Sequence, residues 1–139
     1  MGMRFTILAS GSTGNASIID AGEAKLMVDA GLSAKKLEQL MEMREFDPRK
    51  LDGILITHEH SDHIKGLSVL ARKYELPVYA NEKTWRAMEK HVADIPDNKR
   101  HIVETGGTVS FGGLRVESFA ISHDAADPVG YCFVHDGLK

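Results

Sequence analysis

The stretch that most constrains this chain is 53–66, where a short apolar run passes directly into a cluster of metal-binding residue types. Residues Ile54 to Ile56 are unbroken apolar sequence, which is typical of a short buried strand. The residues that follow are Thr57-His58-Glu59-His60-Ser61-Asp62-His63. Imidazole nitrogen and carboxylate oxygen are the donors that Zn²⁺ and neighbouring divalent metals take in proteins. A polar loop after a buried strand can simply be solvated, but this density of donors favours a metal site.

The spacing inside this motif predicts two groups of metal ligands. In an extended loop His58 and His60 lie two residues apart and project to the same side. Asp62 is well placed to begin a helix, and together with His63 it presents a second nitrogen and oxygen pair on the first helical turn. The stretch can therefore serve two metals. Glu59 lies between two ligands and is expected to point the other way, so we assign it no catalytic role.

A second predicted strand also ends in a histidine. Residues 114–121 alternate in polarity, as a half-buried strand does, and are followed by Ser122-His123-Asp124. Ligands gather outside the strand ends of open α/β sheets. His123 is therefore a candidate third nitrogen for the metal held by His58 and His60; the alternative is a solvated histidine at a strand end.

The order of predicted elements indicates an α/β fold, a sheet with covering helices, in one domain of ordinary size. The first part of the chain predicts strands at Arg4–Ala9, Ile18–Asp20, Lys25–Val28, Ile54–Ile56 and Pro77–Ala80, and helices at Ser33–Arg44, Asp62–Tyr74 and Asn81–Val92. Ser33 and Asn81 are the residue types that cap helix N-termini. From Ile102 onward, strands and glycine turns predominate.

Charge and hydropathy exclude some classes of protein. The net charge of −3 and the pI of about 6.1 argue against a strongly basic nucleic-acid binder. Two divalent metals would change that charge to +1 and concentrate the positive charge in one cleft, which allows an anionic substrate. No apolar run approaches the roughly 18 residues of a membrane span, and the N-terminus lacks the layout of a signal peptide. With Cys132 as its single cysteine, the chain is expected to be cytoplasmic, without a membrane partner.

The loop Ser10-Gly11-Ser12-Thr13-Gly14-Asn15 consists of small residues and follows the first predicted strand. Backbone N–H groups of such a loop can cradle a phosphate, although this one lacks the lysine and the spacing of a Walker loop. Ser10, Ser12 and Asn15 are the candidate substrate-binding residues. The alternative is a tight turn between two strands.

The motif Thr57-His58-Glu59-His60-Ser61-Asp62-His63 resembles the metal signature of the metallo-β-lactamase fold, an αββα sandwich. The resemblance implies that the first two histidines of the motif and His123 bind one metal. It implies that Asp62 and His63 contribute to a second metal, with Asp62 as the catalytic residue. It also implies that Asp29, at the end of an early strand, is a buried carboxylate that orients the motif loop.

The resemblance extends along the chain to the YycJ/WalJ-type bacterial subgroup. The segments that carry it are Leu8–Asn15, His63–Leu67, Leu70–Tyr74, Tyr79–Trp85 and Ile121–Ala125. It implies a metal-dependent phosphodiesterase, a 5′-to-3′ exonuclease acting on DNA, or alternatively on RNA, through water activated by two divalent metals. Mixed imidazole and carboxylate ligands suit Zn, Mn or Fe.

The chain departs from the family pattern after His123. Family members continue for a comparable length and supply a bridging Asp and a final His, and Asp124 and Asp127 lie too close behind His123 to match the bridging Asp. Residues 1–139 are thus expected to be a single domain, the N-terminal half of the fold, with its C-terminal half missing. We expect a weak second metal site, reduced activity and an exposed apolar sheet face open to self-association.

Two other functions stay open on this evidence. One is hydrolysis of a thioester or a lactam by the same activated water. The other is a non-catalytic metal-binding fragment.

Overall fold

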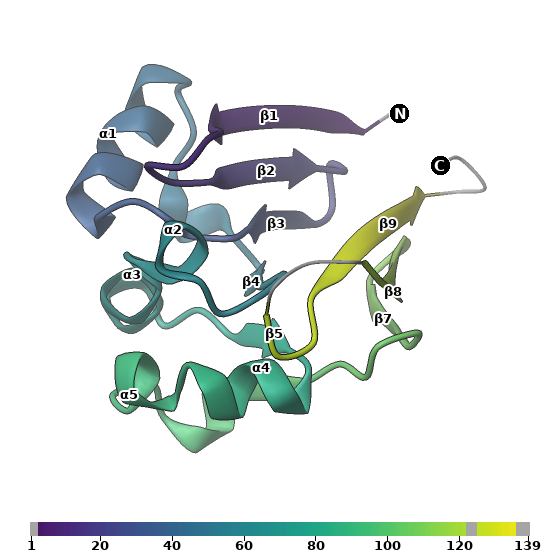
Figure 1. Cartoon of the computed structure of the whole chain (residues 1–139). Helices are drawn as coiled ribbons and strands as arrows, with labels where there is room; N and C mark the ends of the chain where they lie inside the picture. Colours follow the sequence, from purple (N-terminus) through teal and green to yellow (C-terminus); the bar gives the residue numbers. More distant parts are fainter. Residues whose placement is uncertain (1–2, 122–124, 136–139) are drawn as a thin grey trace.

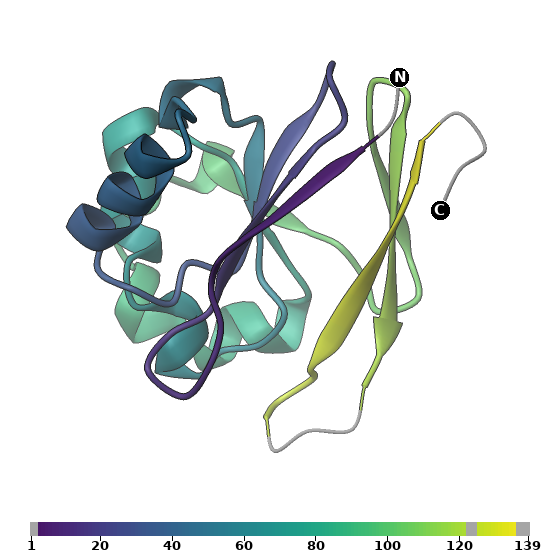
Figure 2. The same cartoon turned by 90° about the horizontal axis from the view of Figure 1, so that it is seen from above.

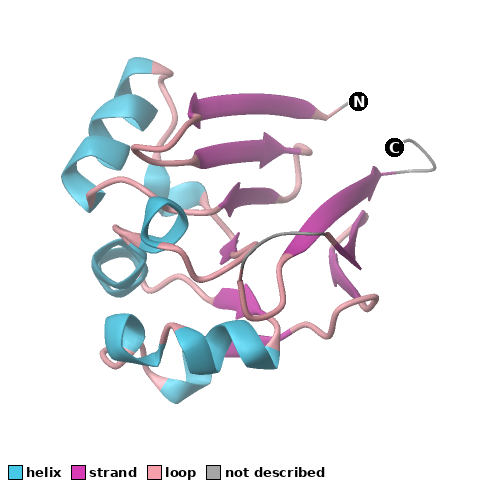
Figure 3. Cartoon of the chain, viewed as in Figure 1, coloured by secondary structure: helices cyan, strands magenta, loops and turns pink. Residues whose placement is uncertain are grey.

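The computed structural model of the chain describes residues 3–121 and 125–135. Within these residues the fold has three layers: helices, a six-stranded sheet and a three-stranded sheet (Figures 1 and 2). Figure 3 shows that the helices all lie on one side of the larger sheet. The predicted α/β class is confirmed.

The larger sheet brings the ends of several strands to one edge. Its strands, in spatial order, are β1 (Arg4–Ala9), β2 (Ala16–Asp20), β3 (Lys25–Val28), β4 (Gly53–Leu55), β5 (Val78–Ala80) and β6 (Arg100–Ile102). The pairs β1–β2 and β2–β3 are antiparallel, and the pairs from β3 to β6 are parallel. Strand β1 therefore runs in the same direction as β3, β4 and β5, and the loops that follow these four strands meet at the same edge.

The described helices are α1 (Ala34–Met43), α2 (Ser61–Ile64), α3 (Leu67–Tyr74), α4 (Glu82–Ala87) and α5 (Glu89–Val92), with 3₁₀ turns η1 (Pro48–Lys50) and η2 (Asp97–Lys99). Two of them, α1 and α4, begin at the capping residues that the sequence predicts. Ser33 Oγ accepts from the N–H of Lys36 at 3.2 Å, and Asn81 Oδ1 accepts from the N–H of Thr84 at 2.8 Å. Each bond satisfies an N–H group that the first helical turn leaves unpaired. The predicted third helix is two segments that meet at the buried Met88.

The predicted continuous helix over 62–74 is wrong, because the chain breaks at Gly66 into α2 and α3. Gly66 donates its N–H to the carbonyl of Ala30 at 2.8 Å. A Cβ at this position would lie 2.2 Å from the carbonyl oxygen of Leu32, so only glycine permits this close approach of two backbones. Helix α2 has His60 as its N-cap residue, and Asp62 lies in its first turn rather than at its start.

The smaller sheet consists of β7 (Thr108–Phe111), β8 (Leu114–Ala120) and β9 (Val129–His135), all antiparallel. It packs on the face of the larger sheet that the helices leave open. Its buried contact residues include Leu114, Val116 and Phe133, which meet Leu26 and Leu55. This inter-sheet core fixes β9 beside the strand that leads into the histidine motif.

Apolar side chains remain exposed on both sheets. Phe5 and Ile7 on β1 are 57% and 59% exposed, and Phe119 on β8 is 48% exposed. The Phe5 ring meets Phe133 of β9 edge-on, with 5.9 Å between the ring centroids, so the exposed side of β1 faces the smaller sheet.

Among the described helices, the ten-residue α1 is the longest, and none has the length and apolar character needed to cross a membrane.

Candidate metal centre

The histidine motif leaves β4 at the sheet edge where the loops after β1 and β3 also lie. Backbone hydrogen bonds join these three loops: Asn15 N–H donates to the Asp62 carbonyl at 2.7 Å, and Ala30 N–H donates to the His63 carbonyl at 2.8 Å. The N–H of Gly31 in turn donates to the carbonyl of Asn15 at 2.9 Å. The motif is therefore held between two loops that precede it by about 30 to 50 residues in the chain.

Gly31 is needed for this close packing. A Cβ on Gly31 would lie 1.8 Å from the carbonyl oxygen of Asp62, well inside any tolerated contact. The sequence Val28-Asp29-Ala30-Gly31 thus serves the motif in two ways: Gly31 admits the backbone of the motif, and Asp29 binds its side chains.

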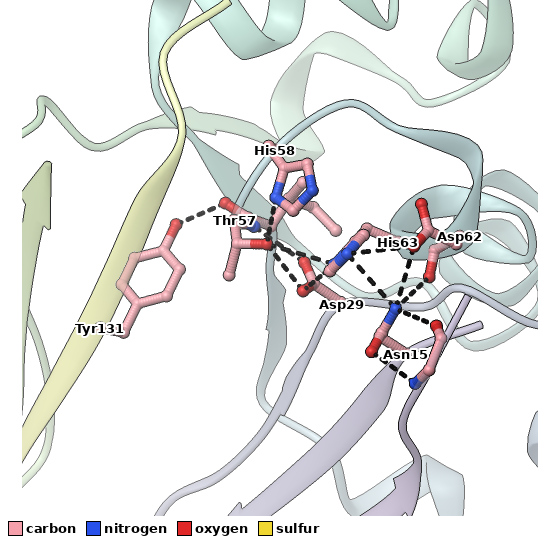
Figure 4. Close-up of polar contacts among 9 residues, drawn as sticks. Asn15, Asp29, Thr57, His58, Asp62, His63 and Tyr131 are labelled. Atoms are coloured by element: carbon pink, nitrogen blue, oxygen red, sulfur yellow. Dashed lines mark hydrogen bonds and ion pairs between the residues drawn. The ribbon is translucent and has the colours of Figure 1, made fainter. Parts of the chain in front are cut away.

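Asp29 is a buried carboxylate, 4% exposed, that accepts three hydrogen bonds from the motif (Figure 4). Its Oδ1 accepts from the N–H of Thr57 at 2.8 Å, and its Oδ2 accepts from the Thr57 hydroxyl at 2.7 Å. Oδ2 also lies 2.6 Å from Nδ1 of His63. Asp29 has φ +64°, a left-handed conformation that Asp and Asn tolerate better than most residues.

These contacts determine where two histidines carry their protons. An ionised carboxylate only accepts, so His63 Nδ1 must be the donor to Asp29. The Thr57 hydroxyl donates its hydrogen to Asp29, so it accepts from His58 Nδ1, which lies 3.0 Å away. Neutral His58 and His63 therefore both carry the proton on Nδ1, and their Nε2 atoms keep the lone pair that a metal would use.

Burial and charge act in opposite directions on His63. Burial lowers the pKa of His63, but the hydrogen bond to Asp29 and the charges of Asp29 and Asp62 together outweigh it, so the pKa is raised. On the neighbouring strand β9, burial raises the pKa of Tyr131, with a smaller contribution from the charge of Asp29. Tyr131 is thus a permanent donor, and its hydroxyl binds the carbonyl of Ile56 at 2.7 Å (Figure 4).

The structure places four of the predicted ligands near one another, without closing them into one coordinating set. The ring centroids of His58 and His63 lie 3.8 Å apart, and those of His58 and His60 lie 4.9 Å apart. Asp62 Oδ2 lies 3.5 Å from Nε2 of His63. His123, the predicted further ligand, is outside the described residues.

The donor chemistry of these side chains fits a divalent cation. Across residues 3–121 and 125–135, no three His, Cys, Asp or Glu side chains converge into a set that could hold a metal ion. Nevertheless, the motif supplies imidazoles whose protons Asp29 and Thr57 retain on Nδ1, with a carboxylate beside the Nε2 of His63. Metal-binding histidines are commonly oriented by such carboxylate contacts.

The predicted substrate loop after β1 lies at the same edge. Ser10 and Ser12 are exposed, whereas Asn15 is half-buried and its side chain turns onto the motif (Figure 4). Substrate contact by these three residues stays a prediction.

Sequence reasoning missed three residues that hold this centre together. Thr57 connects Asp29 to His58. The only sequence feature that could have indicated this role is its position directly before His58. Glu59 Oε2 accepts from the N–H of Ala126 at 3.0 Å. Tyr131 binds the end of β4 from the smaller sheet, a contact over 75 residues that no local pattern indicates.

Comparisons with known proteins agree with this architecture. The Metallo-beta-lactamase superfamily profile matches residues 9–139. Exodeoxyribonuclease YycJ of Bacillus anthracis is 55% identical over 139 residues, which are 100% of this chain and 53% of that protein. Exodeoxyribonuclease WalJ of Streptococcus pneumoniae serotype 2 (strain D39) is 51% identical over 138 residues, which are 98% of this chain and 51% of that protein. The chain thus spans about half the length of the curated relatives it matches.

Solved structures share the fold at low sequence identity. A Cronobacter sakazakii metallo-β-lactamase with a HARLDQ motif matches with a TM-score of 0.78 and 16% identity, over 98% of this chain and 58% of that one. A diphosphatase of the PhnP family matches with a TM-score of 0.73 and 21% identity, over 96% of this chain and 63% of that one.

Proposed function

The chain belongs to the metallo-β-lactamase superfamily, and on that premise we propose that it is part of a metal-dependent exodeoxyribonuclease. The observation that carries the metal chemistry is the buried Asp29, which with Thr57 holds the protons of His58 and His63 away from the Nε2 atoms. The support for DNA as the substrate is the identity of more than half over the whole chain to a protein named exodeoxyribonuclease.

The proposed ligands form two sets. His58 and His60, with His123 as their third partner, would hold the first divalent cation, and Asp62 and His63 would contribute to the second. What supports the place of His123 is that residues following it contact the motif: Val129 N–H donates to the Thr57 carbonyl at 2.9 Å. Zn, Mn and Fe all suit these donors. When bound, the two cations would supply an activated water and neutralise charge on the attacked phosphate.

The chain's own residues then have defined tasks. Asp29 and Thr57 keep the imidazole rings oriented, and Asp62 would supply a carboxylate ligand to the second cation. The exposed Ser10 and Ser12 are proposed to contact a substrate phosphate through hydroxyl and backbone N–H groups.

We further propose that the chain is the N-terminal portion of a longer fold and acts in the cytoplasm. The support for the longer fold is the half-length match to the relatives and the exposure of Phe5 and Ile7 on the inner face of β1; the support for the cytoplasm is the single cysteine, Cys132. The isolated chain would then bind a second metal weakly. It would also tend to self-associate through this face, which light scattering on the purified chain tests.

The experiment uses a form extended to the relatives' length, loaded with Zn²⁺ or Mn²⁺, on DNA with a 5′ phosphate. We expect nucleotides to be released from the 5′ end, loss of that release with His58→Ala, and no turnover of a thioester or a lactam. Thioester or lactam hydrolysis with intact DNA would assign the other substrate class. Bound metal with no turnover of any of the three would leave a metal-binding module.

A further inference from the structure

The side chain of Asn15 connects the loop after β1 to the motif. Its Nδ2 lies 2.9 Å from the Gly11 carbonyl, 3.2 Å from both the carbonyl and Oδ2 of Asp62, and 3.3 Å from Nε2 of His63. Its Oδ1 accepts from the N–H of Gly11 at 3.1 Å. Both ends of the carboxamide are therefore engaged, and three of its five contacts are to the residues proposed for the second cation.

The amide nitrogen has two hydrogens for these four acceptors. One hydrogen is donated to the Gly11 carbonyl, the nearest acceptor, and this bond fixes the plane of the carboxamide within its own loop. The second hydrogen points at Asp62 and His63, whose Oδ2 and Nε2 atoms lie 3.5 Å apart. Without metal, an N–H donor close to both atoms holds the carboxylate and the imidazole lone pair facing the same point. A bound cation would take over the single Nε2 lone pair, and the amide would keep its contact with Asp62, whose carboxylate has further lone pairs.

The backbone gives this contact a fixed frame. Asn15 N–H donates to the Asp62 carbonyl, and Gly31 N–H donates to the Asn15 carbonyl, at 2.7 and 2.9 Å. The main chain of Asn15 is thus held whether or not its side chain is present. The side chain is free to act on the Asp62 carboxylate, which is 31% exposed and would otherwise sample several rotamers.

We propose that Asn15 is a positioning residue for the second metal, which orients Asp62 and His63 toward one cation. This inference rests on the proposed function, because it assumes that these two residues bind metal. It gives the Ser10–Asn15 loop two roles: Ser10 and Ser12 face solvent, and Asn15 faces the ligands.

The test compares Zn²⁺ binding by the wild type, Asn15→Ala and Asn15→Ser, with a chromophoric chelator as competitor. All three proteins are in the form extended to the relatives' length, because the isolated chain is expected to hold the second metal weakly. Both variants lack the amide donor, and serine retains a hydroxyl that can accept from Gly11. We expect the dissociation constant of the second Zn²⁺ to rise about tenfold in both, as is typical when a partner of a metal ligand is lost, and that of the first to stay unchanged.

The matched control is Ser33→Ala, which removes the capping bond of α1 at a site away from the motif. This variant should have a lower melting temperature. Its two dissociation constants should match those of the wild type. The inference is overturned if Asn15→Ala binds the second Zn²⁺ as the wild type does, if both metals weaken together, or if the wild type binds only one metal. A wild type that binds no metal overturns the proposed function itself.

Discussion

Replacement of Asp29 by asparagine tests the proton arrangement that the metal centre depends on. Asparagine has nearly the same shape and tolerates φ +64° as well as aspartate does, so the backbone should not change. Its oxygen can still accept from the N–H of Thr57. Its NH₂ group, however, would take the place of Oδ2, where Thr57 Oγ1 and His63 Nδ1 now donate at 2.7 and 2.6 Å.

The expected loss of metal affinity follows from the change of tautomer that Asp29→Asn forces on His63. Facing an NH₂ group, His63 would have to accept at Nδ1 and move its proton to Nε2, the atom proposed to bind metal. The thermodynamic loss is about one hydrogen bond to a charged group, roughly 1.5–3 kcal/mol. That corresponds to about 10- to 150-fold weaker binding of a metal that uses His63 Nε2.

Two measurements on Asp29→Asn check this prediction. Zn²⁺ competition should show the weaker binding, and ¹⁵N NMR of the metal-free protein should show the His63 proton on Nε2 instead of Nδ1. Asp20→Asn is the control, since Asp20 ends β2 at the opposite edge and accepts from the N–H of Gly22 at 2.8 Å. Unchanged Zn²⁺ affinity with the proton still on Nδ1 would refute the reasoning.

Three further changes probe the supports around the centre. Gly31→Ala places a methyl 1.8 Å from the carbonyl oxygen of Asp62 and should lower the free energy of unfolding by about 3 kcal/mol or more in urea; a loss near zero would mean the loops separate freely. Tyr131→Phe leaves the Ile56 carbonyl without its donor and should lower the free energy of unfolding by about 1–2 kcal/mol; an equal stability would show that water replaces the hydroxyl. Glu38 has its pKa lowered by hydrogen bonds from a lysine and a tyrosine of α3, so its contribution is present above its ordinary pKa of 4.5 and is lost as pH falls. Glu38→Gln should therefore lower the melting temperature by about 2 °C or less at pH 7 and not at pH 3, and an equal drop at both pH values would contradict this.

Local patterns in the sequence predicted those parts of the fold that depend on neighbouring residues. Ser33 and Asn81 cap helices as expected, because a capping bond spans only three residues. The apolar run from Ile54 predicted the central strand, and the motif that follows supplies four candidate ligands on one short loop. The break at Gly66 could not be predicted, since it arises from contact with the backbone of Leu32 across the fold.

Contacts between distant segments explain the rest of what the sequence did not reveal. The bond from Tyr131 to Ile56 spans 75 residues, and the contacts of Asn15 with the motif span 47 and 48. Asp29 could be named only by resemblance to a family, because nothing in a strand-end aspartate indicates which histidine it will meet. The sequence therefore indicates candidate ligands within one motif, but it does not indicate which distant residues orient them.

The central claim is that His58, His60, Asp62 and His63 form a metal centre, and elemental analysis of the freshly purified 139-residue chain tests it most directly. We predict a stoichiometric amount of Zn, Mn or Fe in the wild type and a large loss in His58→Ala. His91→Ala, at an exposed histidine of α5, is the matched control and should keep its metal. A wild type with near-zero metal, unaltered by His58→Ala, would contradict the account.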